Sequence, residues 1–136
     1  MKIGFSLPGK FHFKPILIYL VKKNYLRLLI ISHLGYVKNW LNFDNLNGIK
    51  LFNTIIFELL YRIPNKLGIT VYHQQREQIF FIIFDFFSQY FISKRVNFLI
   101  GCSHTSLYTF RKAKNIGIKT ILEVSSAHVL TQALIM

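Results

Sequence analysis

The sequence has one cysteine, three prolines and only five acidic residues, against 17 lysines and arginines, in a chain of 136 residues. The single cysteine, Cys102, excludes an intrachain disulfide, which fits a reducing compartment. The shortage of carboxylates leaves a formal net charge of +12 at pH 7. Such a charge attracts nucleic acid, anionic lipid headgroups or phosphorylated substrates, and by itself it does not distinguish among them.

The sequence also lacks an apolar run long enough to cross a membrane. The best candidate, Ile79 to Ile92, is shorter than the roughly 18 residues that a spanning helix needs, and it contains Asp85. We interpret it as a buried or membrane-surface helix. Near the N-terminus, Pro15 and Lys22-Lys23 bound an apolar run that is too short for a signal peptide, so none is expected.

Hydrophobic residues make up 52% of the chain and charged residues 16%, which excludes a disordered or coiled-coil protein. No internal repeat, low-complexity tract or flexible linker interrupts the sequence. Residues 1–136 are therefore interpreted as one domain.

Short apolar segments alternate with helical ones along the chain. Strands are expected at Lys2–Leu7, Leu26–Ile31, Ile49–Phe52, Ile69–Tyr72, Val96–Ile100 and Lys119–Val124. Helices are expected from Pro15 to Val21, from a cap at Thr54 to a stop at Pro64-Asn65, over Gln75–Ser93, and from a cap at Ser103 to Gly117. The Gly35–Gly48 segment is expected to be a loop.

The Gln75–Ser93 helix is apolar nearly all round, which predicts that it packs inside the core. A strand, a helix and a second strand within about thirty residues form a right-handed parallel βαβ unit. The repeated alternation therefore predicts an α/β fold with a Rossmann-like, doubly wound parallel sheet and helices on both faces.

Open parallel sheets bind ligands beyond the carboxyl ends of their strands. The first segment in such a position is Pro8-Gly9-Lys10, where Gly9 would let a ligand approach the backbone and a following helix N-terminus would favour anions. The chain has no GxGxxG and no GxxxxGK[ST] motif, which excludes a standard dinucleotide or P-loop fingerprint. The alternative is an ordinary strand-to-helix turn.

The second segment is Gly101 to Ser106, in which Cys102, Ser103 and His104 are adjacent. A Cys/His nucleophile is one interpretation, but catalytic pairs are normally brought together by the fold and not by adjacency in sequence. The alternative is a small buried thiol beside a helix cap at Ser103, with His104 as a loop histidine.

The third segment is Glu123 to His128. A strand-end carboxylate, the hydroxyls of Ser125 and Ser126 and a histidine could bind sugar hydroxyls, and either Glu123 or His128 could act as a base. The alternative is that one of the serines caps a following helix and His128 lies on its surface. No metal site is expected, because the remaining histidines have no cysteine or carboxylate partner at metal-ligand spacing: His12, His33 and His73.

The stretch Phe98 to Gln132 contains a series of short motifs. It begins with a strand ending in glycine, a Ser-Leu pair and a basic helix that also ends in glycine. A Thr-Ile-Leu-Glu strand follows, and then a serine-rich turn with a histidine and a later glutamine. The residues are Gly101, Ser103, Ser106-Leu107, Arg111-Lys112-Ala113-Lys114, Gly117, Thr120–Glu123, Ser125-Ser126, His128 and Gln132. This set, about a quarter of the chain, resembles the N-terminal, acceptor-side domain of a group 4 glycosyltransferase with the GT-B fold. It departs from the family in having Val124-Ser125-Ser126 where relatives often have Arg-Gly-Ser.

The resemblance implies hexosyl transfer from a nucleotide sugar to a cell-envelope or other glycan acceptor, or to a lipid-linked one. It makes Glu123 and His128 the candidate catalytic residues. The residues expected to bind substrate are Gly9, Lys10, Ser103, His104, Ser125 and Ser126. In the family, a second Rossmann-like domain holds the donor, and this chain stops at Met136. We therefore expect 136 residues alone to be inactive, with no tightly bound cofactor and the nucleotide sugar as co-substrate.

An alternative from a different class is a non-catalytic basic module that binds an anionic membrane surface or nucleic acid. No recognised nucleic-acid motif is present, so nucleic acid is not expected as the partner. A transferase that works on lipid-linked acceptors would also use basic and aromatic residues, such as Tyr19, Tyr25 and Trp40, to dock on anionic lipid. The expected location is cytoplasmic, peripheral on the inner face of the membrane.

Overall fold

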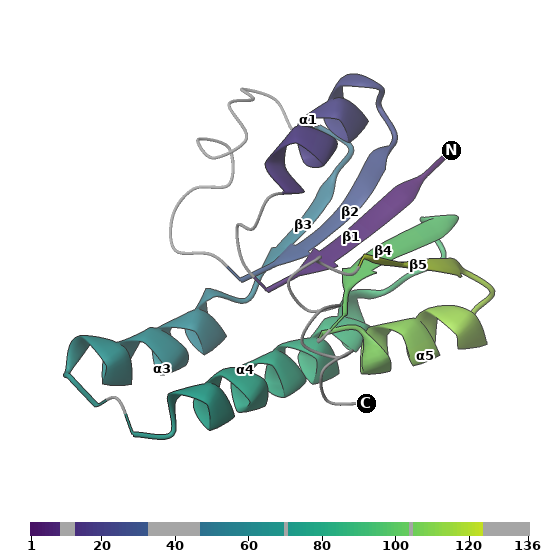
Figure 1. The fold of residues 1–136 in the computed structure, drawn as a ribbon. Helices are drawn as coiled ribbons and strands as arrows, with labels where there is room; N and C mark the ends of the chain where they lie inside the picture. The colour runs from purple at the N-terminus through teal and green to yellow at the C-terminus, as the bar shows by residue number, and fades with distance from the viewer. Residues whose placement is uncertain (9–12, 33–46, 70, 104, 124–136) are drawn as a thin grey trace.

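The computed structural model describes residues 1–8, 13–32, 47–69, 71–103 and 105–123. Along the chain the elements are β1 (Ile3–Leu7), α1 (Lys14–Lys22), β2 (Leu26–Ile31), β3 (Lys50–Asn53), α3 (Ile55–Lys66), α4 (His73–Ser88), the 3-10 helix η2 (Gln89–Phe91), β4 (Phe98–Cys102), α5 (Leu107–Asn115) and β5 (Lys119–Glu123). Figure 1 shows one twisted sheet with α1 on one face and α4 and α5 on the other.

The five strands pair in parallel in the order β3-β2-β1-β4-β5. This arrangement confirms the predicted α/β, Rossmann-like, doubly wound sheet. The chain builds outward from β1 to β3 and then crosses back to place β4 on the other side of β1. The strand order therefore reverses between β1 and β4, which is where doubly wound sheets open a crevice for ligands.

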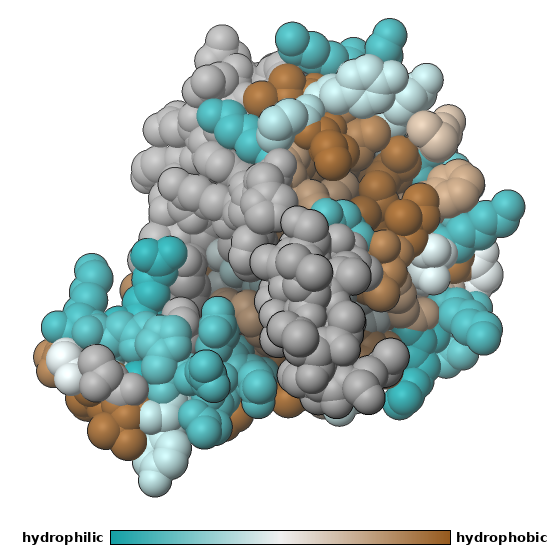
Figure 2. Space-filling view, viewed as in Figure 1, coloured by the Kyte–Doolittle hydropathy of each residue, from teal (hydrophilic) through white to brown (hydrophobic). Residues whose placement is uncertain are grey.

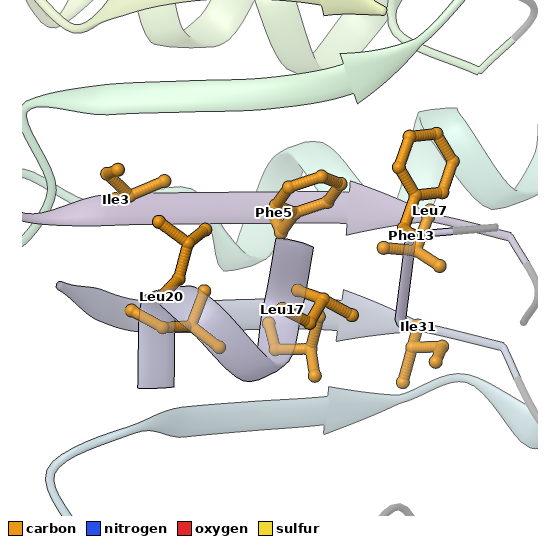
Figure 3. Close-up of a cluster of buried hydrophobic side chains, with 9 residues drawn as sticks. Ile3, Phe5, Leu7, Phe13, Leu17, Leu20 and Ile31 are labelled. Carbon is orange, nitrogen blue, oxygen red and sulfur yellow. The ribbon is translucent and has the colours of Figure 1, made fainter. Parts of the chain in front are cut away.

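The core on the α1 face comes from alternate residues of β1. Ile3, Phe5 and Leu7 pack against α1, and Phe5 meets the ring of Phe13 edge-on at 5.4 Å between centroids (Figure 3). Leu17 of α1 is fully buried between them. Full burial of such a side chain stabilises the fold by about 1.5–3 kcal/mol. Helix α1 carries Pro in its first turn, as predicted, because that position needs no N–H donor.

The opposite face is covered by α4 and α5. Its buried cluster joins β2, α4, the segment before β4, β4 and α5, through Leu28, Ile30, Phe84, Ile92, Val96, Leu99, Ala113 and Ile118. Helices therefore cover both faces, so β1 and β2 are apolar almost throughout, as parallel strands buried on two sides must be.

Helix α5 ends as the sequence predicts. Gly117 has a φ of +80°, in the left-handed region that favours glycine. The N–H of Gly117 donates to the Lys114 carbonyl at 3.1 Å, and the N–H of Ile118 donates to the Ala113 carbonyl at 2.9 Å. These two bonds form a Schellman motif, and buried Ile118 and Ala113 complete it in the same core cluster.

Two predictions around α3 are wrong, a strand and the end of the helix. Ile69–Tyr72 is not a strand: Val71 and Tyr72 form a turn between α3 and α4, and Tyr72 has a φ of 59°. β-branched residues form a strand only where a sheet neighbour is available, and this segment lies beyond the sheet. Pro64 does not stop α3, which continues to Lys66. Pro64 falls in the last turn, where the helix loses only the single bond that the missing N–H would have made.

Helix α4 is not buried all round. Phe80 and Phe84 are buried, whereas Ile79 is 55% exposed and Ile82 is 54% exposed. Only one face of α4 packs on the sheet and α5, so the prediction of an enclosed helix is wrong. No helix in the described part of the chain is long and apolar enough to cross a bilayer. Most of the predicted Gly35–Gly48 loop lies outside the described residues.

Candidate functional site

The candidate site is the carboxyl edge of the sheet where β1 and β4 lie side by side. Ser6 of β1 is the register partner of Gly101 of β4, and both residues are buried. Pro8 follows β1 and Ser103 follows β4 at this edge. The strand order therefore brings two of the three predicted segments, which are far apart in sequence, to the switch point.

The strand was predicted to stop at Gly101, and this prediction is wrong: β4 continues through Gly101 to Cys102. A Cβ at this position would lie 2.2 Å from Ser106 Oγ and 2.9 Å from Phe110 Cε1. Glycine is therefore required here for the first turn of α5 to pack directly against the strand. Its role is close packing beneath the candidate site.

The cap of α5 is not Ser103. Ser106 occupies the N-cap position, and its hydroxyl donates back to the Cys102 carbonyl at 2.7 Å instead of capping the helix. Ser103 uses its backbone N–H to reach the Glu123 carbonyl at 3.1 Å. That bond extends the pairing of Cys102 with Glu123, so Ser103 and Glu123 lie together at the ends of β4 and β5.

The N-terminus of α5 is capped from another helix. Asp85 of α4 is only 3% exposed, and its Oδ2 accepts the Tyr108 N–H at 2.7 Å. Its Oδ1 accepts the Thr109 N–H at 3.1 Å and the Thr109 hydroxyl at 2.8 Å. This contact was not predicted from the sequence, although a lone carboxylate in an aromatic helix indicates a buried partner. Because Asp85 already fills the anion site at this helix end, α5 does not offer that site to a phosphate.

The Cys102 thiol does not fit the role of a nucleophile. Burial, reinforced by the Glu123 carboxylate, raises its pKa to about 12. The nearby Thr105 side chain lowers the pKa of the thiol and so offsets part of this rise. The Thr105 hydroxyl itself has no hydrogen-bond partner among the described residues. The reactive form of cysteine is the thiolate, and this thiol stays protonated at neutral pH. The buried-thiol interpretation of Cys102 is the one that fits.

The rim at the end of β2 and β3 is also fixed by short contacts. The Thr54 N–H and hydroxyl both donate to the Ile31 carbonyl, at 2.8 and 3.3 Å, and the Ser32 hydroxyl donates to the Thr54 carbonyl at 3.1 Å. Thr54 holds the N-cap position as predicted, but its side chain ties α3 to β2 and makes no cap bond. These bonds therefore anchor the N-terminus of helix α3 at the carboxyl edge of the sheet.

One solved structure shares this fold. The chain superposes on TcCGT1, whose crystal structure was determined in complex with UDP, with a TM-score of 0.59 and 20% sequence identity. The match covers 90% of this chain and 27% of that chain, so the chain spans about a quarter of TcCGT1. TcCGT1 has the GT-B fold of glycosyltransferases, and the likeness shows the fold. No protein-family model and no curated protein matches the sequence.

Several predicted site residues lie outside the described part of the chain: Gly9, Lys10, His104, Ser125, Ser126 and His128. Their roles stay predictions. Among the described residues, no group of three His, Cys, Asp or Glu side chains could hold a metal ion. The described candidates are therefore Ser103 and Glu123, side by side on the rim.

Proposed function

We propose that the chain supplies the acceptor-side domain of a glycosyltransferase that moves a hexosyl group from a nucleotide sugar to a glycan or lipid-linked acceptor. The observation that carries the proposal is the reversal of strand order between β1 and β4, in a sheet that matches a UDP-bound GT-B protein. The Phe98–Gln132 set adds the resemblance to group 4 of these enzymes. The proposed location is cytoplasmic, at the inner face of the membrane.

Glu123 is the described residue best placed for chemistry. It ends β5 at the carboxyl edge, is half-buried and neighbours Ser103. In the proposed reaction, an acceptor hydroxyl bonds to the anomeric carbon of the sugar while the bond from that carbon to the nucleotide diphosphate breaks. Glu123 would take the hydroxyl proton, as general bases in such positions do. His128, outside the described residues, is the second candidate for the same role.

The donor belongs to a second domain in this proposal. GT-B enzymes work in a cleft between two Rossmann-like domains, and this chain spans 27% of the matched structure. We therefore expect the chain to bind acceptor on its own and to transfer no sugar until it is combined with a donor-binding domain. The nucleotide sugar is a co-substrate, and no other cofactor is needed.

Chemical-shift mapping tests the proposed site on the chain alone. Titrating the ¹⁵N-labelled chain with short oligosaccharides should shift amides at the carboxyl edge, near Leu7, Ser103 and Glu123. UDP should shift them little, because the donor belongs to the second domain. Shifts confined to the amino ends of the strands, such as Lys50 and Lys119, would contradict the proposal. The matched variant Glu123→Gln should keep the fold and weaken oligosaccharide binding, because an amide replaces the charged acceptor of a hydroxyl proton.

A specific observation also favours the alternative of a basic binding module. Eight basic residues lie at the amino ends of the strands or just before them: Lys2, Lys22, Lys23, Arg27, Lys50, Lys94, Arg95 and Lys119. The acidic residues in the described part of the chain lie in α3, in α4 and at the end of β5. We call the eight basic residues the basic edge. It is opposite the candidate site, so an anion bound there would not compete with a sugar acceptor.

A further inference from the structure

Helix α3 exposes an apolar stripe along its length. Ile56, Leu60, Ile63 and Leu67 recur at helical spacing on one face, and their exposed fractions are 61%, 64%, 50% and 71%. The connection to α4 continues the stripe with Val71, 62% exposed, and Tyr72, 70% exposed. Single exposed apolar residues are ordinary, but a continuous set of this size marks an interaction surface.

These side chains lie on an element that projects from the domain. Figure 1 shows α3 and the start of α4 extending away from the sheet, on the side of the carboxyl edge. In Figure 2 the far end of this hairpin, at lower left, carries apolar side chains below a band of polar ones. We call the end of the hairpin, with Leu60, Ile63, Leu67, Val71 and Tyr72, the hairpin tip.

The hairpin tip is held in shape by its own contacts. Arg76 of α4 reaches back across the turn, where its Nη2 donates to Asn65 Oδ1 at 3.0 Å and to the Ile69 carbonyl. The Ile69 N–H donates to the Pro64 carbonyl at 3.0 Å, and Gly68 takes a φ of +75° to end α3. A preformed apolar tip loses little conformational entropy when it binds.

Two exposed basic residues, Arg62 and Lys66, lie beside the tip on α3, whereas Arg76 of α4 is turned inward to hold the connection and is followed by Glu77. Between Arg62 and Arg76 the sequence carries Arg62, Lys66 and Arg76 and no acidic residue. Lysine and arginine beside an apolar surface keep their charged ends at the level of lipid headgroups while their stems lie along it. Each basic residue near an anionic leaflet strengthens the attraction to it. A second copy of this chain fits poorly, because a net charge of +12 on each copy opposes self-association.

We propose that the hairpin tip inserts into the headgroup region of an anionic phospholipid bilayer and orients the carboxyl edge of the sheet toward the membrane. Thr54, the N-cap of helix α3, lies on the same edge as the candidate site. The proposal adds a partner to the proposed function and explains how a lipid-linked acceptor would reach Glu123. It does not require sugar transfer, because lipid insertion depends only on the tip.

Flotation with phosphatidylcholine vesicles, with and without phosphatidylglycerol, measures this insertion on the 136-residue chain without sugar or nucleotide present. The chain should float with the anionic vesicles, and Leu67→Ser/Val71→Ser should bind them at least about tenfold more weakly, since two apolar side chains no longer leave water. The matched variant Leu107→Ser/Tyr90→Ser removes two side chains that are 64% and 69% exposed elsewhere, and should bind like the unchanged chain.

Three results would overturn the proposal. The first is an equal loss of binding in both double variants. The second is a larger loss with Lys22→Gln/Lys23→Gln, which would assign the membrane contact to the basic edge. The third is a dimer in sedimentation that Leu67→Ser/Val71→Ser converts to a monomer, which would assign the tip to a second copy. Failure of the oligosaccharide titration would leave these measurements unchanged, so the two proposals fail separately.

An environment-sensitive dye gives a second measurement that is independent of the loss of affinity. Attached at Val71→Cys, the dye should shift to the blue when anionic vesicles are added, and attached at Lys23→Cys on the basic edge it should not. Cys102 is a poor competitor for the label because its thiol is largely buried and protonated. A shift at Lys23→Cys and none at Val71→Cys would reverse the proposed orientation.

Discussion

Asp85 in α4 accepts both the backbone N–H and the side-chain hydroxyl of Thr109 in the first turn of α5, at 3.1 and 2.8 Å. The two residues are 24 positions apart, and this contact joins the helices that cover one face of the sheet. Helix α5 in turn packs on Gly101, directly below the candidate site. The contact therefore fixes the first turn of α5 in place against the strand that leads to Ser103.

Replacing Asp85 should destabilise the domain. Asp85→Ala leaves two helix N–H groups and a buried hydroxyl without partners, so we expect it to lower the free energy of unfolding by about 2–4 kcal/mol. Asp85→Asn keeps an acceptor without the charge and should cost less. Urea denaturation measures both. The control Gln78→Ala, at an exposed position of the same helix, should stay within about 0.5 kcal/mol.

Gly101 should tolerate no added carbon atom. In Gly101→Ala the new Cβ would push Ser106 Oγ off the Cys102 carbonyl and crowd Phe110, so we expect a loss of about 1–3 kcal/mol. The comparison is Gly4→Ala, where the nearest atom is a leucine methyl at 3.2 Å that can give way. Thermal unfolding followed by circular dichroism ranks the two. A Gly101→Ala variant as stable as Gly4→Ala would show that α5 is free to move away from β4.

The Cys102 thiol makes stability fall in alkaline solution. Its pKa is raised from 9.0 to about 12 in the folded chain, so the unfolded chain loses the thiol proton first as the pH rises. Above pH 9 the unfolded state is therefore favoured, by up to about 1.4 kcal/mol per pH unit. Below pH 9 both states keep the proton and the effect vanishes.

The measurement for this prediction is urea denaturation of the unchanged chain and Cys102→Ala from pH 8 to pH 10.5. The difference between the two curves isolates the thiol from the lysines and tyrosines that also titrate in this range. Glu123→Gln should reduce the effect, because the carboxylate is the second cause of the raised pKa. Parallel curves for the unchanged chain and Cys102→Ala would show that the thiol is more exposed than its position indicates.

The parts of the fold that could be predicted are those encoded by neighbouring residues. Leu26–Ile31 was placed residue for residue, because a parallel strand buried on both faces is a nearly continuous apolar run, interrupted here only by Arg27. The end of α5 was predicted from Gly117, because the left-handed backbone there requires glycine. The shared edge of Ser103 and Glu123 follows from strand order, which the alternation of elements indicates.

The rest depended on contacts that no local pattern contains. Ser103 was predicted to cap α5 from its place just before the helix. The residue that caps α5 is Asp85, which comes from another helix and is not indicated by the local sequence. The Ile69–Tyr72 segment has the composition of a strand, but it lies between two helices that project beyond the sheet. The exposure of one face of α4 was not predictable either, because the sequence of a helix that is apolar nearly all round does not indicate which side packs against the core.

Arg76 should control the shape of the hairpin tip without affecting the sheet. Arg76→Ala removes the bonds to Asn65 and the Ile69 carbonyl, so we expect the connection between α3 and α4 to open locally. Proteolysis should then cut near Leu67 at a higher rate, while the urea midpoint changes little. Arg76→Lys keeps the charge, but its side chain is one bond shorter than the arginine side chain as far as Nη2 and cannot reach both acceptors, so it should resemble Arg76→Ala. Vesicle binding should weaken in both variants, because the apolar tip must then be ordered during insertion. Proteolysis near Leu67 that is unchanged by Arg76→Ala would show that the helices alone hold the tip.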